Sequence, residues 1–139
     1  MHSYLDQNPL GIVLAPDGSL RILPHRLRIP DVSFIRWERF PNRKLPADRV
    51  FRVAPDLAVE ILSEGNTPEE MDQKLDEYFA AGVQLVWYID PRERRATAYT
   101  AVDQFVELGV DDALEGGSVL PGFSLPLRTL FDRFERETV

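Results

Sequence analysis

The sequence predicts an α/β or α+β domain organised around a mixed β-sheet. Three segments support this class: an apolar strand-like segment at residues 57–62, an amphipathic helical segment at 67–82, and an apolar segment at 83–90. A strand, a long helix and a buried strand in this order are typical of a βαβ crossover. We expect antiparallel strand pairs beside this crossover, because shorter strand-like segments occur on both sides of it.

The segments before the crossover read as strands and loops. PDGS at 16–19 is a strong turn signal between GIVLA and LRIL, so it predicts a hairpin of those two segments. RLRIPDVSFIRW, 26–37, is strand-like, and its Pro30 suggests an edge, a bend or a strand start. FPNRKLPADR, 40–49, is polar and contains proline, which predicts a loop.

The helical segment carries both start and stop signals. Thr67 is suited to the N-cap, Pro68 to the first helical position, and Glu70 completes a capping box. Gly82 is suited to the C-terminal end. One apolar stripe is formed by Met71, Leu75, Tyr78 and Phe79. After the 83–90 strand, RATAYTA and QFVEL predict two shorter strands, and LRTLFDRFERE has helical spacing.

Composition limits the class of protein. The 139 residues suit one domain, 1–139, and the absence of cysteine excludes disulfides and thiolate metal sites. With no recognisable signal peptide and no apolar run of membrane-spanning length, we expect a cytoplasmic protein without membrane partners. The net charge of −7 argues against a basic nucleic-acid coat protein but does not exclude a metal-dependent nuclease, whose cations supply local positive charge.

The most informative residue is Glu60, an acid within the apolar run PDLAVEILSEG. An unpaired carboxylate in an apolar interior costs several kcal/mol or becomes protonated. Because side chains alternate along a strand, Glu60 shares one face with Ala58 and Leu62. Asp31 follows Pro30 in another strand-like run, and two carboxylates from neighbouring strands would form an oxygen site suited to Mg²⁺ or Mn²⁺.

Lys74 is the third candidate. At about 100° per residue, it lies about 60° from Met71 and about 40° from Tyr78 around the helix, on the flank of the apolar stripe. A lysine in this position could lie along the sheet and direct its ammonium group to the two acids.

Each candidate also has a structural interpretation. Glu60 could form an internal ion pair with Arg28 or Arg52. Asp31 could cap a turn after Pro30, and Lys74 could extend its charge to solvent from a partly buried stem.

Four motifs in order resemble a large bacterial family of putative restriction endonucleases with a PD-(D/E)XK nuclease-like core. These motifs are PDVSFI, PDLAVEILSEGN, a helix with Lys74, Glu77 and Tyr78, and GVQLVWYIDP. The resemblance implies a restriction-endonuclease-like fold, a central mixed sheet flanked by helices. It also implies that Asp31 is the first metal acid and Glu60 the second.

The sequence departs from the family pattern in two places. The usual lysine stands two residues after the second acid, where this chain has Leu62, and the resemblance suggests Lys74 as a migrated substitute. Family members also usually begin with an N-terminal region that includes an acid near the site. HSYLDQNPLG resembles the end of that region, so we expect a domain that lacks it.

Three hypotheses follow. The first is a Mg²⁺-dependent endonuclease for DNA, in which Asp31 and Glu60 hold the metal and Lys74 neutralises charge on the phosphate. The second is a catalytically weak or inactive nuclease fold that serves as an interaction module in a homodimer. The third is a purely structural domain with Glu60 in an internal ion pair.

Charge distribution bears on the first two hypotheses. The acidic isoelectric point, about 4.8, favours the interaction module, because duplex binding depends on phosphate neutralisation. The segment 26–44 nevertheless concentrates basic residues that could form a local patch for DNA. These are Arg26, Arg28, Arg36, Arg39, Arg43 and Lys44.

Overall fold

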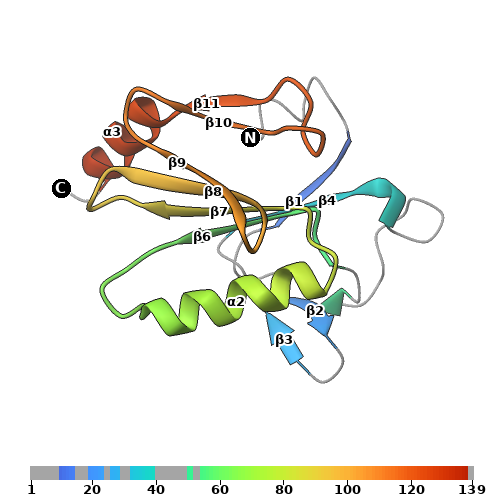
Figure 1. Cartoon of the computed structure of the whole chain (residues 1–139). Helices are drawn as coiled ribbons and strands as arrows, with labels where there is room; N and C mark the ends of the chain where they lie inside the picture. The colour runs from blue at the N-terminus through green and yellow to red at the C-terminus, as the bar shows by residue number, and fades with distance from the viewer. Residues whose placement is uncertain are drawn as a thin grey trace.

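The computed structural model of the chain describes residues 10–14, 19–23, 26–28, 32–39, 50–51 and 54–137. A six-stranded mixed sheet forms its centre (Figure 1). Its strands, in spatial order, are β1 (Gly11–Leu14), β4 (Val32–Arg36), β6 (Leu57–Ile61), β7 (Leu85–Asp90), β8 (Arg95–Ala101) and β9 (Gln104–Leu108). The predicted mixed-sheet class is therefore confirmed.

Helix α2 (Pro68–Ala80) connects β6 to β7, which lie side by side and parallel. The Thr67 hydroxyl accepts a hydrogen bond from the Glu70 N–H at 3.1 Å, as the capping signal predicts. The chain turns after the helix at Gly82, whose φ of +101° is unfavourable for residues with a side chain. The predicted βαβ crossover is confirmed, with its helix on one face of the sheet.

The opposite face is covered by the C-terminal segment 113–137 (Figure 1). It comprises the hairpin of β10 (Ala113–Glu115) and β11 (Ser124–Pro126), followed by α3 (Leu127–Glu137). Trp87 stacks on Phe123 there at a centroid distance of 5.9 Å. Among the described residues, this larger core cluster has only apolar members.

The predicted hairpin of GIVLA and LRIL is wrong. β1 pairs with β4 instead, and Gly11 packs so closely that an added Cβ would lie 2.0 Å from the Ile35 carbonyl oxygen. The LRIL segment belongs to β2 (Ser19–Leu23), in a separate three-stranded sheet with β3 (Arg26–Arg28) and β5 (Val50–Phe51). The strand-like run at 26–37 is divided accordingly between β3, β4 and the short 3₁₀ helix η1 (Trp37–Arg39). The expected loop at 40–49 lies outside the described residues.

Within the described part of the chain, we find no helix long and apolar enough to span a membrane.

Candidate active site

Glu60 projects from β6 toward α2. Its neighbours on that face, Ala58 and Leu62, both pack in the apolar cluster formed with the helix. The carboxylate is buried, with 6% of the residue exposed. The strand places Glu60 beside Tyr88 of β7, its register partner. A charged group thus lies at the interface of sheet and helix, the arrangement that the sequence leaves unexplained.

Two side chains of α2 reach Glu60. The Tyr78 hydroxyl donates a hydrogen bond of 2.5 Å to Glu60 Oε1, which is in the range of charge-assisted O–H···O⁻ bonds. The Lys74 ammonium nitrogen lies 3.8 Å from Glu60 Oε2, and the Lys74 side chain is 21% exposed. Lys74 is therefore on the flank of the buried stripe, with its charge toward the sheet. The ion pair of Glu60 with Arg28 or Arg52, left open above, concerns side chains outside the described part.

The function of Tyr78 was missed in the sequence interpretation, which assigned it to the apolar stripe. Its ring is buried in that stripe, with only 1% of the residue exposed. Its hydroxyl nevertheless fixes one oxygen of Glu60. A tyrosine one helical turn after Lys74 is the only sequence signal for this contact, because positions i and i+4 share a helix face.

Asp31 lies outside the described residues, so its predicted approach to Glu60 stays a prediction. Val32, the next residue, opens β4 and pairs with Val59, the residue before Glu60. The strand that follows Asp31 in the sequence, β4, and the strand that contains Glu60 are therefore adjacent and antiparallel.

Asp56 is a second buried acid that the sequence interpretation did not single out. It is 2% exposed and directly precedes β6. Its Oδ2 accepts the Arg36 N–H at 2.7 Å, and its Oδ1 accepts the Arg39 Nε–H at 2.8 Å. Arg39 also donates to the Gly82 carbonyl, after α2. Asp56 thereby joins the end of β4 and η1 to the start of β6.

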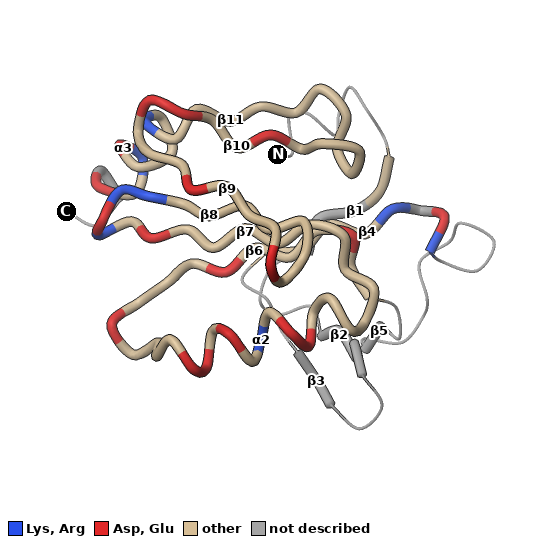
Figure 2. The backbone as a smooth tube through the Cα atoms, viewed as in Figure 1, with Lys and Arg blue, Asp and Glu red and all other residues tan. Residues whose placement is uncertain are grey.

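These contacts change the interpretation of the predicted basic patch. Arg36 and Arg39 are bound to internal partners, since Arg36 also donates to the Ser118 carbonyl at 3.2 Å. The other four patch residues have no described side chains. Around Glu60 the described surface is acidic: exposed acids line α2, where Lys74 is the single basic residue (Figure 2). Positive charge on α2 itself is thus limited to Lys74.

The donor chemistry of Glu60 fits Mg²⁺ or Mn²⁺, which prefer carboxylate oxygens. Tyr78 orients Oε1 of Glu60. The Lys74 nitrogen lies beyond hydrogen-bond distance of Oε2, so a divalent cation could replace Lys74 as the neighbour of that oxygen. The described residues contain no group of three or more His, Cys, Asp or Glu that could hold a metal. A complete ligand set would therefore need Asp31 in addition to Glu60.

Comparison with known proteins now identifies the family. The sequence model of Uma2, described as putative restriction endonuclease, matches residues 1–128. The chain belongs to this family. Its motif resemblance to putative restriction endonucleases is confirmed. A comparison with curated proteins found no match.

The Uma2 chain also resembles a solved structure. This is the crystal structure of a putative nuclease belonging to DUF820 from Anabaena variabilis ATCC 29413. The TM-score is 0.80 at 21% sequence identity, and the similarity covers 94% of this chain and 73% of that chain. At this level of identity the comparison establishes the common fold, which is nuclease-like.

Proposed function

We propose that this Uma2 chain is a metal-dependent endonuclease that hydrolyses DNA phosphodiester bonds. In this proposal Asp31 and Glu60 hold Mg²⁺ or Mn²⁺, and Lys74 acts on the scissile phosphate. The observation that carries the proposal is the buried Glu60 carboxylate with the Lys74 ammonium 3.8 Å from it. Membership of a family described as putative restriction endonucleases supports the same reaction class.

The adjacency of β4 and β6 supports the two-acid site. Val32 and Val59 are paired, and each is the sequence neighbour of one proposed metal acid, with consecutive Cα atoms about 3.8 Å apart. A divalent cation held by the two carboxylates would act as a Lewis acid on a phosphoryl oxygen.

Lys74 supplies a positive charge from the protein itself. Its helix is anchored through the buried side chains of Met71, Leu75 and Tyr78, so the ammonium group is held over the end of β6. When phosphate binds, the ammonium exchanges part of its interaction with Glu60 for a phosphoryl oxygen. Charge that develops on that oxygen during hydrolysis is then stabilised by a preorganised donor.

Tyr78 positions the acid. Its hydrogen bond to Oε1 restricts rotation of the Glu60 carboxylate, so that Oε2 remains directed toward Lys74 and the proposed cation. Hydrogen bonds of this kind to a ligating carboxylate typically influence metal affinity about 10–100-fold.

A plasmid-nicking assay tests the proposal. We expect the wild type to nick supercoiled DNA with Mg²⁺ or Mn²⁺ and to lose this activity with a chelator. Asp31→Asn and Glu60→Gln should each be inactive while retaining the circular-dichroism spectrum of the wild type. Glu64→Gln is the matched control, because Glu64 follows β6 with a side chain 88% exposed. Equal nicking by wild type and Glu60→Gln would refute the proposed site.

A second candidate function is an interaction module that forms a homodimer. Strand β9 is an edge of the sheet, and its Phe105 and Val106 are 52% and 59% exposed. Exposed apolar edge strands are prone to pair with another chain. Antiparallel pairing of two copies about Val106 would set Phe105 opposite Glu107 and Gln104 opposite Leu108, without opposing like charges.

Sedimentation velocity tests whether two copies of the chain associate through β9. A homodimer through β9 should become monomeric on Val106→Lys, which adds like charges at the centre of the contact, while Asp103→Lys in the preceding turn should remain dimeric. A monomeric wild type at micromolar concentration would exclude the module in this form.

A further inference from the structure

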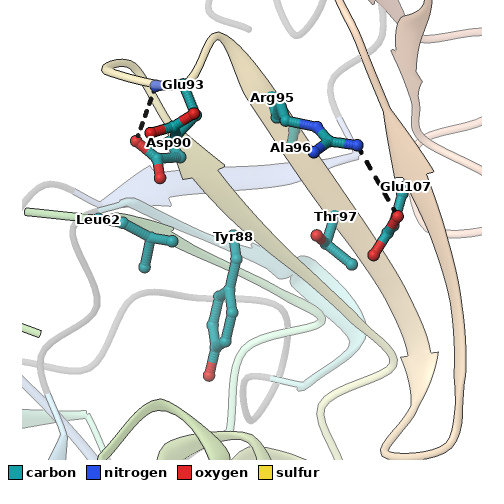
Figure 3. Close-up of a pocket in the computed structure, with 8 residues that line it drawn as sticks. All are labelled: Leu62, Tyr88, Asp90, Glu93, Arg95, Ala96, Thr97 and Glu107. Atoms are coloured by element: carbon teal, nitrogen blue, oxygen red, sulfur yellow. Dashed lines mark hydrogen bonds and ion pairs between the residues drawn. The ribbon is translucent and has the colours of Figure 1, made fainter. Parts of the chain in front are cut away.

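A hollow on the α2 face of the sheet is lined in part by two sheet neighbours of Glu60. It has a volume of about 340 Å³, within the usual range of small-molecule sites (Figure 3). Leu62, on the same face of the strand as Glu60, forms one wall, and Tyr88, the register partner of Glu60, forms another. Thr97 of β8, the register partner of Tyr88, extends the lining away from the acid. The hollow is therefore one strand removed from the proposed cleavage site.

An adjoining hollow of about 260 Å³ shares Leu62, Tyr88 and Asp90 with the first. It continues to Tyr99 and to the first turn of α2. The two adjoining hollows, together called the depression, extend from β6 to β9.

Three aromatic side chains form a row here: Tyr88 and Tyr99 line the depression, and Phe105 lies beyond it on the edge strand. Tyr88 and Tyr99 meet edge to face at a centroid distance of 5.3 Å, and Tyr99 contacts Phe105 at 5.4 Å. The row rises from buried Tyr88, 6% exposed, to Phe105 on the edge strand. The Tyr88 hydroxyl donates to the Met71 carbonyl at 2.6 Å, which fixes the inner ring in position. Tyr99 packs against this fixed ring, lines the adjoining hollow and is partly exposed, so its ring is the one suited to stacking against a planar ligand.

The charges of the lining disfavour phosphate and favour hydrogen-bond donors. The first hollow has carboxylates of Asp90, Glu93 and Glu107 against one guanidinium, that of Arg95, which lies 4.0 Å from Glu107 (Figure 3). Burial raises the pKa of the Tyr99 phenol, and the carboxylates of Asp72 and Glu107 raise it further. The adjoining hollow adds Asp72 and Arg92, so carboxylates still outnumber guanidinium groups around the depression. These surroundings repel anions and offer acceptors to a neutral, planar group that carries N–H donors.

We propose that this depression binds an unstacked nucleobase with an exocyclic amino group, next to the phosphate that is cleaved. The inference rests on the proposed nuclease function, which places the phosphate of the same nucleotide strand at Glu60 and Lys74. Exocyclic amino groups of bases donate to carboxylates, as in contacts of Glu or Asp with cytosine N4. The bases of an intact duplex are stacked within the helix, so the substrate is single-stranded DNA or a nucleotide extruded from a duplex.

This assignment also accounts for the net charge of the chain. With a net charge of −7, neutralisation of many phosphates by the whole surface is a weak source of affinity. Stacking of a base on an aromatic side chain contributes about 1–3 kcal/mol and does not require positive charge. The aromatic row therefore supplies a binding energy that the acidic surface cannot.

Saturation-transfer NMR with free nucleosides tests the subsite without metal, phosphate or cleavage. Cytidine and adenosine should receive saturation from the protein, whereas thymidine, which lacks an exocyclic amino group, should bind more weakly. Tyr99→Leu should weaken cytidine binding about tenfold through loss of stacking. Thr97→Val, nearly isosteric, provides a second variant in case the first disturbs the fold. Val106→Ala, on the opposite face of β9, should bind like the wild type.

The outcomes separate this inference from the proposed function. Absence of nucleoside binding, equal binding of cytidine and thymidine, or no effect of both Tyr99→Leu and Thr97→Val would overturn the subsite. Preference for single-stranded over duplex oligonucleotides in cleavage, lost in Tyr99→Leu, would support it. Nucleoside binding in a protein that cleaves nothing with Mg²⁺ or Mn²⁺ would refute the nuclease while retaining the subsite. Equal cleavage of both substrates would retain the nuclease and overturn the subsite.

Discussion

Two carboxylates lie at opposite ends of β6, and both are buried beside a cation. At the N-terminal end, Asp56 accepts hydrogen bonds of 2.7 and 2.8 Å from Arg36 and Arg39. At the C-terminal end, Glu60 accepts a phenolic hydrogen bond from Tyr78, and the Lys74 ammonium nitrogen lies 3.8 Å from its other oxygen. Asp56 is bound directly by groups of β4 and η1, whereas Glu60 is contacted by two side chains of α2, Tyr78 and Lys74.

The difference separates an acid whose contacts lie within the fold, Asp56, from the acid that we propose binds metal, Glu60. Asp56 connects the end of β4 and η1 to β6, so both of its carboxylate oxygens accept hydrogen bonds within the fold. Glu60 holds an ammonium group beyond hydrogen-bond distance, and a cation or phosphate could enter this pair without breaking a hydrogen bond between its members. We therefore expect substitutions at the first end to affect stability and substitutions at the second to affect activity.

Lys74→Ala should have the largest effect, and it should be on activity. Loss of a preorganised donor to a developing charge lowers rates about 10²–10³-fold. The free energy of unfolding should change less than the activation free energy, because Lys74 is partly exposed, its contact with Glu60 is long and Glu60 keeps its hydrogen bond from Tyr78. Nicking assays and denaturant melts on the same protein measure both quantities.

Two further variants control the Lys74 measurement. Asp76→Ala, on the exposed face of the same helix, should leave the cleavage rate unchanged. Lys74→Arg should restore part of the activity, because it retains a positive charge. Cleavage by Lys74→Ala at the wild-type rate would remove Lys74 from the mechanism and favour the interaction module.

Asp56→Asn should destabilise the fold by about 2 kcal/mol. The amide offers one oxygen in place of two, so either the Arg36 N–H or the Arg39 guanidinium loses its acceptor. Urea melts would show the loss as a lower midpoint with an unchanged slope. Glu38→Gln is the matched control, since Glu38 pairs with Arg36 at the surface and should contribute little. A stable Asp56→Asn protein would contradict the division of roles along β6.

The sequence predicted the region between these two acids better than the regions beside it. The crossover of β6, α2 and β7 follows from local signals, such as the Thr67 cap and the apolar spacing, that agree with the final packing. The helical wheel also placed Lys74 on the flank of α2, where the structure has it. Where the local sequence signals agree with the tertiary packing, as they do here, the sequence pattern alone predicts the structure.

The remaining features depend on contacts between distant segments. The turn signal at 16–19 suggested a local hairpin, but close packing of Gly11 against Ile35 pairs β1 with β4 instead. Partners of Asp56 and the hydroxyl contact of Tyr78 involve residues far apart in sequence. Apolar periodicity reports that Tyr78 is buried, but not which polar group its hydroxyl meets.

The smallest predicted effect distinguishes two buried tyrosines between α2 and the sheet, Tyr78 of the helix and Tyr88 of β7. Tyr78→Phe removes the donor to Glu60, and Tyr88→Phe removes the donor to the Met71 carbonyl, so each should cost about 1 kcal/mol of stability. Only Tyr78→Phe should also change the metal requirement, because only Tyr78 orients the proposed ligand. We expect it to raise the Mn²⁺ concentration for half-maximal cleavage about tenfold.

Titrations of cleavage against Mn²⁺ in both variants measure this difference, with melting curves as the check on folding. A combined Tyr78→Phe and Glu60→Gln protein should lose less stability than the sum of its single variants, since contacting residues are energetically coupled. Additive losses would mean that the hydroxyl stabilises α2 independently of Glu60. An equal shift of the Mn²⁺ requirement in Tyr78→Phe and Tyr88→Phe would assign the effect to packing of the helix on the sheet, and Tyr78 would then belong with Asp56 among the structural residues.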